Sequence, residues 1–249
     1  MSGHNKWSTI KHKKGKADAA RGKLFTKLIR EIQIAAREGG KDADGNARLR
    51  AAILAARGSN MPKDTIERAI LRGAGELEGE EFEEITYEGY GTGGVAFFVE
   101  VLTTNRNRAV AEVRHKFTKA GGNLGTDGSV AWMFERKGLV EIDAEGVDFD
   151  ELFMAAAEAG AEDVERGEPH AVYCDFSLTN AVSIALEQAG FSVLSAKPTM
   201  VPTTPLDVSG DLALSTFKLM TALDDLDDVQ NVYTNANISD EEMERLAGD

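Results

Sequence analysis

The sequence predicts a multi-domain α+β protein, with an N-terminal three-helix domain followed by two ferredoxin-like α+β domains, one inserted in the other. Three observations lead to this prediction. Residues 17–75 show helical periodicity, and residues 1–75 carry a strong excess of positive charge. An acidic segment, residues 76–88, then separates them from alternating strand and helix patterns. Within that region, residues 139–200 contain one complete β-α-β-β-α-β unit flanked by incomplete pieces.

The N-terminal region begins with a basic stretch, residues 1–16, that has no hydrophobic period and is expected to be a flexible arm. Glycine pairs and single glycines end the helices that follow, and Asn46 is a candidate N-cap for the second of them. The three expected helices are Ala17 to Glu38, Asn46 to Arg57, and Pro62 to Arg72.

Strand-like alternation follows the acidic segment. Expected strands cover residues 85–90 and 95–102, and a helix covers 106–120. The alternating apolar residues Val130, Trp132 and Phe134 predict another strand.

The complete unit has expected strands at 139–142, 162–164, 172–176 and 193–197, with two amphipathic helices between them. Three of the five prolines, at 198, 202 and 205, mark a linker. A last helix (211 to about 223) and strand (229–234) cannot form a domain alone, so we expect them to complete the domain begun before the insert. The predicted domains are 1–75, 76–135 with 204–249, and 136–203.

Composition excludes several classes of protein. The single cysteine, Cys174, rules out an internal disulfide framework and a multi-cysteine metal site, and its alternation with apolar neighbours predicts that it is buried. No apolar run is long enough to span a membrane and no secretory signal precedes the helices, which favours the cytoplasm. The run Gly89–Gly94 matches G-x-G-x-x-G, but a strand follows it rather than a helix, so we expect a hairpin and not a dinucleotide site. We expect no enzyme activity, no cofactor and no metal.

Charge is distributed unevenly. The net charge is −14. Residues 1–75 carry 17 Lys/Arg and 7 Asp/Glu, whereas residues 76–249 carry 11 and 35. Such asymmetry indicates a polyanion-binding module attached to an acidic body.

The first helix gives the most specific signal. Its cations recur at helical spacing on one stripe, opposite a mainly apolar face, although Ile34 falls on the cationic side. A solvated basic face is the alternative, but the adjoining basic arm favours contact with a nucleic-acid backbone. Trp7 either stacks on an unpaired base or anchors the arm on the helices. The expected nucleic-acid-binding residues are Lys6, Trp7, Lys11, His12, Lys13, Lys14, Lys16, Lys23, Lys27, Arg30, Arg37, Arg106 and Arg108.

Two further segments have two interpretations each. Asn105–Arg108 opens a helix after a strand, where phosphate binding and ordinary capping by Thr104 or Asn105 are both consistent with the residues. The glycine-rich run Gly121–Gly128 is suited either to close approach of a phosphate or to a tight loop after a helix.

Several motifs resemble the YebC/PmpR family along essentially the whole chain. They are Gly3–Trp7, Lys11–Asp18, Arg21–Lys27, Tyr87–Gly91, Asn105–Arg108 and Gly121–Val130. The resemblance implies three domains, one helical and two α+β, in a bacterial cytoplasmic protein usually labelled a probable DNA-binding transcriptional regulator. It also implies an alternative role on the ribosome, relieving stalling at proline-rich stretches, and kinship with mitochondrial translational activators of a cytochrome oxidase subunit.

The sequence therefore predicts a non-enzymatic nucleic-acid-binding regulator. A ribosome-associated factor that binds rRNA or tRNA is the alternative. A third hypothesis is a protein adaptor whose acidic body docks a basic partner. Physical reasoning from the residues does not choose between DNA and RNA, because both present phosphates.

Overall fold

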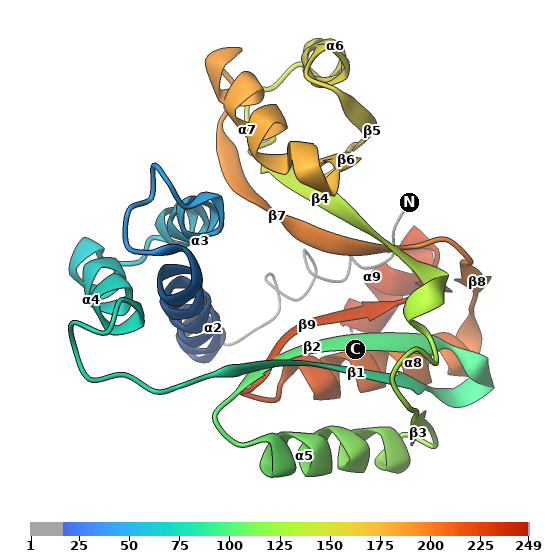
Figure 1. The fold of residues 1–249 in the computed structure, drawn as a ribbon. Helices are drawn as coiled ribbons and strands as arrows, with labels where there is room; N and C mark the ends of the chain where they lie inside the picture. The colour runs from blue at the N-terminus through green and yellow to red at the C-terminus, as the bar shows by residue number, and fades with distance from the viewer. Residues whose placement is uncertain (1–16, 249) are drawn as a thin grey trace. The chain divides into compact units, whose positions relative to one another are not determined.

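A computed structural model describes residues 17–248 of the chain (Figure 1). The chain divides into two compact units. The first unit contains residues 80–135 and 200–248 with the start of the first helix, and the second contains residues 24–79 and 136–199. This division groups the helical residues with the inserted sheet, so the domain boundaries expected above stay a prediction. Among the described residues, no helix combines the length and the apolar character needed to cross a bilayer.

The N-terminal region forms three helices, α2 (Ala17–Gly39), α3 (Ala47–Gly58) and α4 (Lys63–Gly73). Their ends lie within about one residue of the expected positions, because glycine and Asn46 end and begin them as the sequence indicated. Apolar side chains from all three helices share one core that includes Ile32, Leu49 and Ile66. The α4 helix approaches α2 closely at Gly73, where a Cβ atom would lie 2.8 Å from the Cα of Gln33.

Asn46 joins α2 to α3. Its side-chain oxygen accepts a hydrogen bond from the backbone N–H of Leu49 (3.0 Å), which confirms the predicted N-cap. Its side-chain amide donates to the carbonyl oxygens of Ala35 (2.7 Å) and Gly40 (2.8 Å) at the end of α2. One buried side chain therefore satisfies backbone groups at the ends of two helices.

The inserted sheet has the predicted β-α-β-β-α-β order. Its strands pair in the spatial order β5-β6-β4-β7. Its core includes Val140 and Val172, which are opposite each other in the register, and Cys174, which is buried as expected. Burial raises the pKa of the Cys174 thiol. The elements are β4 (Phe134–Ile142), α6 (Phe149–Glu158), β5 (Ala161–Glu165), β6 (His170–Asp175), α7 (Thr179–Gln188) and β7 (Val193–Pro202).

The second sheet belongs to the first unit and pairs in the order β3-β1-β2-β9. Its elements are β1 (Glu83–Tyr90), β2 (Ala96–Thr103), α5 (Arg106–Lys119), β3 (Asn123–Leu124), α8 (Gly210–Asp224) and β9 (Val229–Thr234). The inserted sheet lies between β3 and α8 in the chain, which confirms the insertion. In space this sheet repeats the order of the inserted one, with β1 in the place that β6 occupies there.

Both faces of this second sheet are covered. Phe97, Val99 and Val101 of β2 face a core that also takes side chains from α5 and α8. Ala96 and Phe98 alternate to the opposite face, where they pack with Tyr233. Two short strands and a C-terminal helix complete the unit. They are β8 (Leu206–Asp207), which pairs in parallel with β10 (Ala236–Asn237), and α9 (Asp240–Gly248).

The structure corrects two sequence-based predictions. Val130, Trp132 and Phe134 do not form one strand. Residues 131–133 form a 3-10 turn that buries Val130 and Phe134 against the second sheet and leaves Trp132 65% exposed. The expected proline linker is also partly strand, because β7 runs through Pro198 to Pro202. Proline is compatible with this position because β7 lies at the edge of its sheet.

Candidate nucleic-acid interface

The cations of α2 that the structure describes differ in exposure. Lys23 and Arg37 are exposed, whereas Lys27 and Arg30 are half-buried. The ammonium group of Lys23 forms an ion pair with Asp225, at 2.9 Å between Nζ and Oδ1. Because both side chains are about half exposed, this pair contributes little to stability and is easily exchanged for another anion.

The stripe is not continuous along the helix. Residues 32–36 are all buried, including Ile34, which lies at the angular centre of the stripe and is 1% exposed. The cationic stripe is therefore interrupted at Ile34, the residue that already departed from the pattern in the sequence. Lys23, Lys27 and Arg30 form one group before the buried segment, and Arg37 stands after it.

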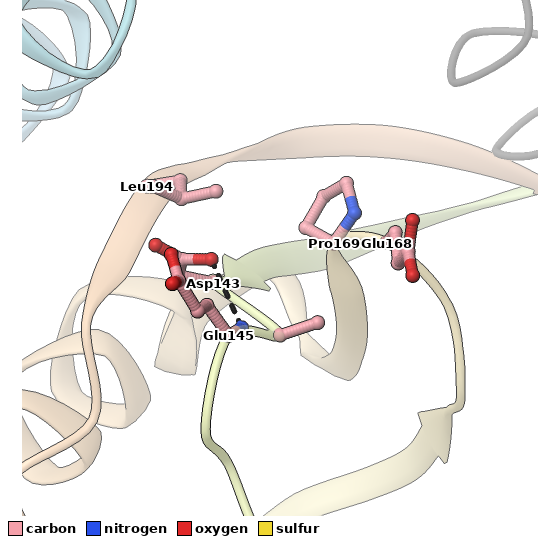
Figure 2. Close-up of a pocket in the computed structure, with 6 residues that line it drawn as sticks. Asp143, Glu145, Glu168, Pro169 and Leu194 are labelled. Atoms are coloured by element: carbon pink, nitrogen blue, oxygen red, sulfur yellow. Dashed lines mark hydrogen bonds between the residues drawn. The ribbon is translucent and has the colours of Figure 1, made fainter.

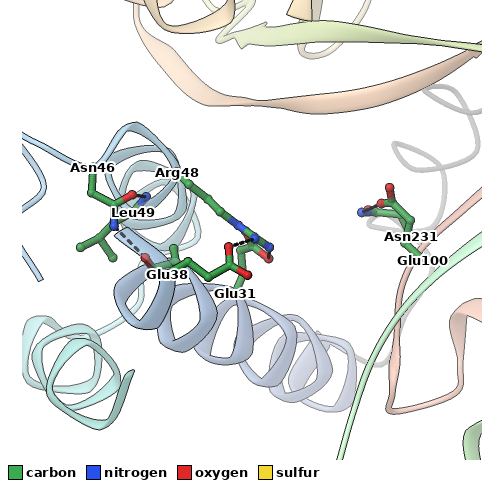
Figure 3. A network of polar contacts seen from close by, with 8 residues as sticks. Glu31, Glu38, Asn46, Arg48, Leu49, Glu100 and Asn231 are labelled. Atoms are coloured by element: carbon green, nitrogen blue, oxygen red, sulfur yellow. Dashed lines mark hydrogen bonds and ion pairs between the residues drawn. The ribbon is translucent and has the colours of Figure 1, made fainter. Parts of the chain in front are cut away.

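Arg48 of α3 compensates the acidic residues that flank this stripe. Its guanidinium forms two hydrogen bonds with Glu31, from Nε to Oε1 (2.7 Å) and from the second terminal nitrogen to Oε2 (3.1 Å). The other terminal nitrogen binds Glu38 at 2.8 Å, and Figure 3 shows the three side chains converging. Glu31 and Glu38 are thereby paired within the helical region, so their carboxylates reduce the positive potential of the neighbouring cations less.

The basic arm lies outside the described residues. The predicted contacts there stay predictions from the sequence. They are Lys6, Trp7, Lys11, His12, Lys13, Lys14 and Lys16.

The segment Asn105–Arg108 opens α5. Asn105 caps the helix by accepting a hydrogen bond from the Arg108 N–H (3.1 Å), so the capping interpretation is confirmed for Asn105. The Arg108 guanidinium binds the buried carboxylate of Asp228 at 2.7 Å, and the Thr103 hydroxyl donates to the same oxygen at 2.8 Å. Asp228 raises the pKa of Arg108. The structure thus gives Arg108 an internal role, whereas Arg106 is exposed at the same helix end.

The glycine-rich loop after α5 is held from within the protein. The carboxylate of Glu88, which is 5% exposed, accepts hydrogen bonds from the backbone N–H groups of Gly128 (2.7 Å), Val130 (2.7 Å) and Ala131 (2.8 Å). The Tyr90 hydroxyl donates to the Ser129 carbonyl at 2.8 Å. Because Glu88 already takes these amides, they are not available to a phosphate, which favours the tight-loop interpretation.

Gly89, the glycine of β1, packs against the residues next to this loop. A Cβ atom at Gly89 would lie 2.7 Å from the carbonyl oxygen of Asn123 and 2.9 Å from the Phe117 ring. Strands β1 and β2 form an antiparallel hairpin through the 3-10 turn Thr92–Gly94. The G-x-G-x-x-G match is therefore a hairpin connection, as predicted.

Sequence reasoning missed further cations on α5. Arg114, His115 and Lys119 are exposed and Lys116 is partly exposed. A count of charges by predicted element would have found them, because residues 106–119 hold five Lys/Arg and a single acidic residue.

A pocket in the inserted domain is lined in part by acidic side chains, unlike the basic surface of α5. Asp143, Glu145 and Glu168 line it together with Pro169 and Leu194 (Figure 2), and the Glu145 N–H donates to Asp143 Oδ1 at 3.2 Å. Its carboxylates make it unsuited to phosphate. Over residues 17–248, no cluster of His, Cys, Asp and Glu has an arrangement that could hold a metal ion.

These features define a class of protein: it has three basic helices and two α+β domains of acidic composition, one inserted in the chain of the other. The family described as "TACO1/YebC protein N-terminal domain" matches residues 5–76, and that described as "TACO1/YebC second and third domain" matches residues 82–236. The chain belongs to the TACO1/YebC family.

Relatives match over nearly their whole length. A protein of Geobacter sp. strain M21 is 57% identical over 99% of this chain and 100% of its own, and one of Geobacter sulfurreducens is 58% identical over the same shares. Both are named probable transcriptional regulatory proteins. The crystal structure of a conserved hypothetical protein from Aquifex aeolicus matches with a TM-score of 0.87 and 51% identity, covering 93% of this chain and 96% of that one.

Proposed function

We propose that this chain is a non-enzymatic cytoplasmic regulator that binds nucleic acid through its N-terminal arm and the cations of α2. One observation carries the proposal: residues 1–75 have a net charge of +10 in a chain whose remaining residues have −24. Phosphate backbones release counterions when cations bind them, and this supplies affinity without sequence-specific contacts. The names of the relatives, probable transcriptional regulatory proteins, support a regulatory role.

An RNA target on the ribosome is the second candidate. The charge distribution supports it, because an acidic body repels a long duplex that lies across it. A short basic segment needs only a local group of phosphates, such as folded RNA presents in a crevice. Both a DNA and an RNA probe are therefore tested in the same experiment.

The experiment compares the full chain with a variant lacking residues 2–16, using a 30-nucleotide single-stranded RNA and a 30-base-pair duplex DNA at several salt concentrations. The deletion removes five lysines. If all five bind phosphates, the slope of log affinity against log salt should fall by about 4.5 for duplex and about 3.5 for single strands.

A charge-preserving variant provides the control. Replacing the same five lysines by arginine should retain the slope, because the number of cations is unchanged. If the deletion leaves both slopes as they are, the arm does not carry binding. If the full chain binds neither probe, the proposed function itself is wrong.

A further inference from the structure

We propose that α5 carries a second contact for the phosphate backbone of nucleic acid, formed by Arg114, His115 and Lys119 along its exposed side and by Arg106 at its first turn. This inference rests on the proposed function and extends it beyond the first turn of α5, the part of this helix that the sequence had marked. It assigns a ligand class, the sugar-phosphate backbone of DNA or RNA, to a helix other than α2.

The charges of the α+β part of the first unit, residues 80–135 and 200–249, are strongly segregated. Residues 80–135 and 200–249 hold seven Lys/Arg and twenty Asp/Glu. Five of the seven cations lie on α5, together with one acidic residue, Glu112. A net charge of +4 on fourteen residues, within two segments that are otherwise strongly negative, produces a local positive field that attracts polyanions.

The geometry of α5 places these cations toward solvent. Ala109, Val113 and Phe117 are buried against the second sheet. At 100° per residue, His115 and Lys119 lie opposite that buried face and Arg114 lies beside it. All three are exposed, and none forms an ion pair with a described residue. The helix is about 20 Å long at a rise of ~1.5 Å per residue, so its cations can meet several successive phosphates.

Helix stability does not explain the first-turn cations. The positive end of the helix dipole disfavours cations there, and the first turn of α5 has no acidic residue. Asp228 compensates Arg108, but Arg106 has no corresponding partner among the described residues. A bound phosphate at this position would meet both Arg106 and the favourable end of the dipole.

A helix surface on which cations predominate favours a backbone with regular negative charges over a folded acidic protein. The helix diameter, about 10–12 Å, is also compatible with the major groove of duplex DNA, which is about 12 Å wide. Glu112 is the one acidic group on this face and weakens the field between Arg108 and Lys116. Contacts with phosphates carry no direct sequence information, so the expected binding by α5 is independent of nucleotide sequence.

The test uses the full chain with Arg114→Gln and Lys119→Gln together. The matched control is Lys218→Gln with Arg245→Gln, which removes the same charge from α8 and α9 of the same unit. Both variants are titrated with the 30-nucleotide RNA and the 30-base-pair DNA between 0.1 and 1 M salt.

For the α5 variant the salt slope should fall by about 1.8 with duplex and about 1.4 with single-stranded RNA. Its affinity deficit should therefore grow about 60-fold and about 25-fold, respectively, as salt falls from 1 M to 0.1 M. A change with only one probe identifies that nucleic acid as the ligand of α5. The control should retain the slope of the unmodified chain, and so should Arg114→Lys with Lys119→Arg.

Two results overturn the inference. Equal losses of affinity and of salt slope in the α5 variant and the control would show that the effect depends on net charge and not on α5. An unchanged slope in the α5 variant, with the unmodified chain still binding, would reject α5 as a nucleic-acid contact and favour an acidic protein as its partner. Either result leaves the proposed function standing, whereas failure of the unmodified chain to bind removes both.

Discussion

The Glu88 carboxylate connects β1 to the glycine-rich loop by hydrogen bonds. Replacing it by an uncharged side chain should therefore destabilise the folded conformation of that loop. Three backbone N–H groups point at its carboxylate within 2.8 Å. In Glu88→Gln, the remaining side-chain oxygen can still accept hydrogen bonds from Val130 and Ala131. The new side-chain NH2 group then faces the Gly128 N–H, and two donors cannot form a hydrogen bond. The variant loses one charge-assisted bond, about 1.5–3 kcal/mol, and weakens two others. We expect a total loss of about 3 kcal/mol.

Glu88→Ala should cost more, about 4–6 kcal/mol, because three amides in or near the core lose their acceptor. Glu83→Gln is the matched control: it removes one carboxylate from an exposed position of the same strand and should change stability by less than about 0.5 kcal/mol. Urea unfolding gives the free energies.

Hydrogen exchange locates the effect of Glu88→Gln. Protection of the Val130 and Ala131 amides should fall about a hundredfold, since about 1.4 kcal/mol corresponds to a factor of ten. Losses below about 1 kcal/mol in both Glu88 variants, with protection unchanged, would refute the idea that this carboxylate holds the loop.

Three further predictions concern other parts of the chain. Gly73→Ala should destabilise the helical region by about 1–3 kcal/mol in urea unfolding, because its Cβ would lie 2.8 Å from Gln33 Cα; a neutral result would contradict the close helix contact. His170 is buried near Arg166, and both features lower its pKa below 6.5, so the folded state favours the neutral ring. Its contribution to stability should be complete above about pH 6.5 and be lost as pH falls below it; His170→Gln should reduce that acid dependence. Trp7→Ala should weaken binding to RNA with unpaired bases by about 1–3 kcal/mol and affect duplex DNA much less; equal losses would exclude stacking.

Local chemistry in the sequence predicted much of the fold. Gly39, Asn46 and Gly73 mark helix ends that can be recognised from residue type and neighbouring sequence. The inserted unit was predictable because its elements follow one another in the chain. The place of β1 in the second sheet was not, since chain order alone does not indicate that an earlier strand fills the position equivalent to β6.

The candidate site was less predictable because long-range pairs decide which charges are available. Asp228 engages Arg108 from 120 positions away, so a predicted phosphate ligand has an internal partner. Glu88 stands in an acidic run, and its sequence context gives no sign that it is buried among amides. Ile34 did carry a signal, since an apolar residue on a cationic stripe indicated burial, which the structure confirms.

Crosslinking in cells is the most direct test of nucleic-acid binding by the N-terminal region and α5. The full chain is irradiated in growing cells, and the peptides joined to nucleic acid are mapped together with the DNA or RNA attached to them. We expect crosslinks within residues 1–37 and on α5, with chromosomal DNA attached if the chain acts in transcription and ribosomal RNA if it acts on the ribosome. Crosslinks confined to residues 139–197, or none above background, would contradict this expectation.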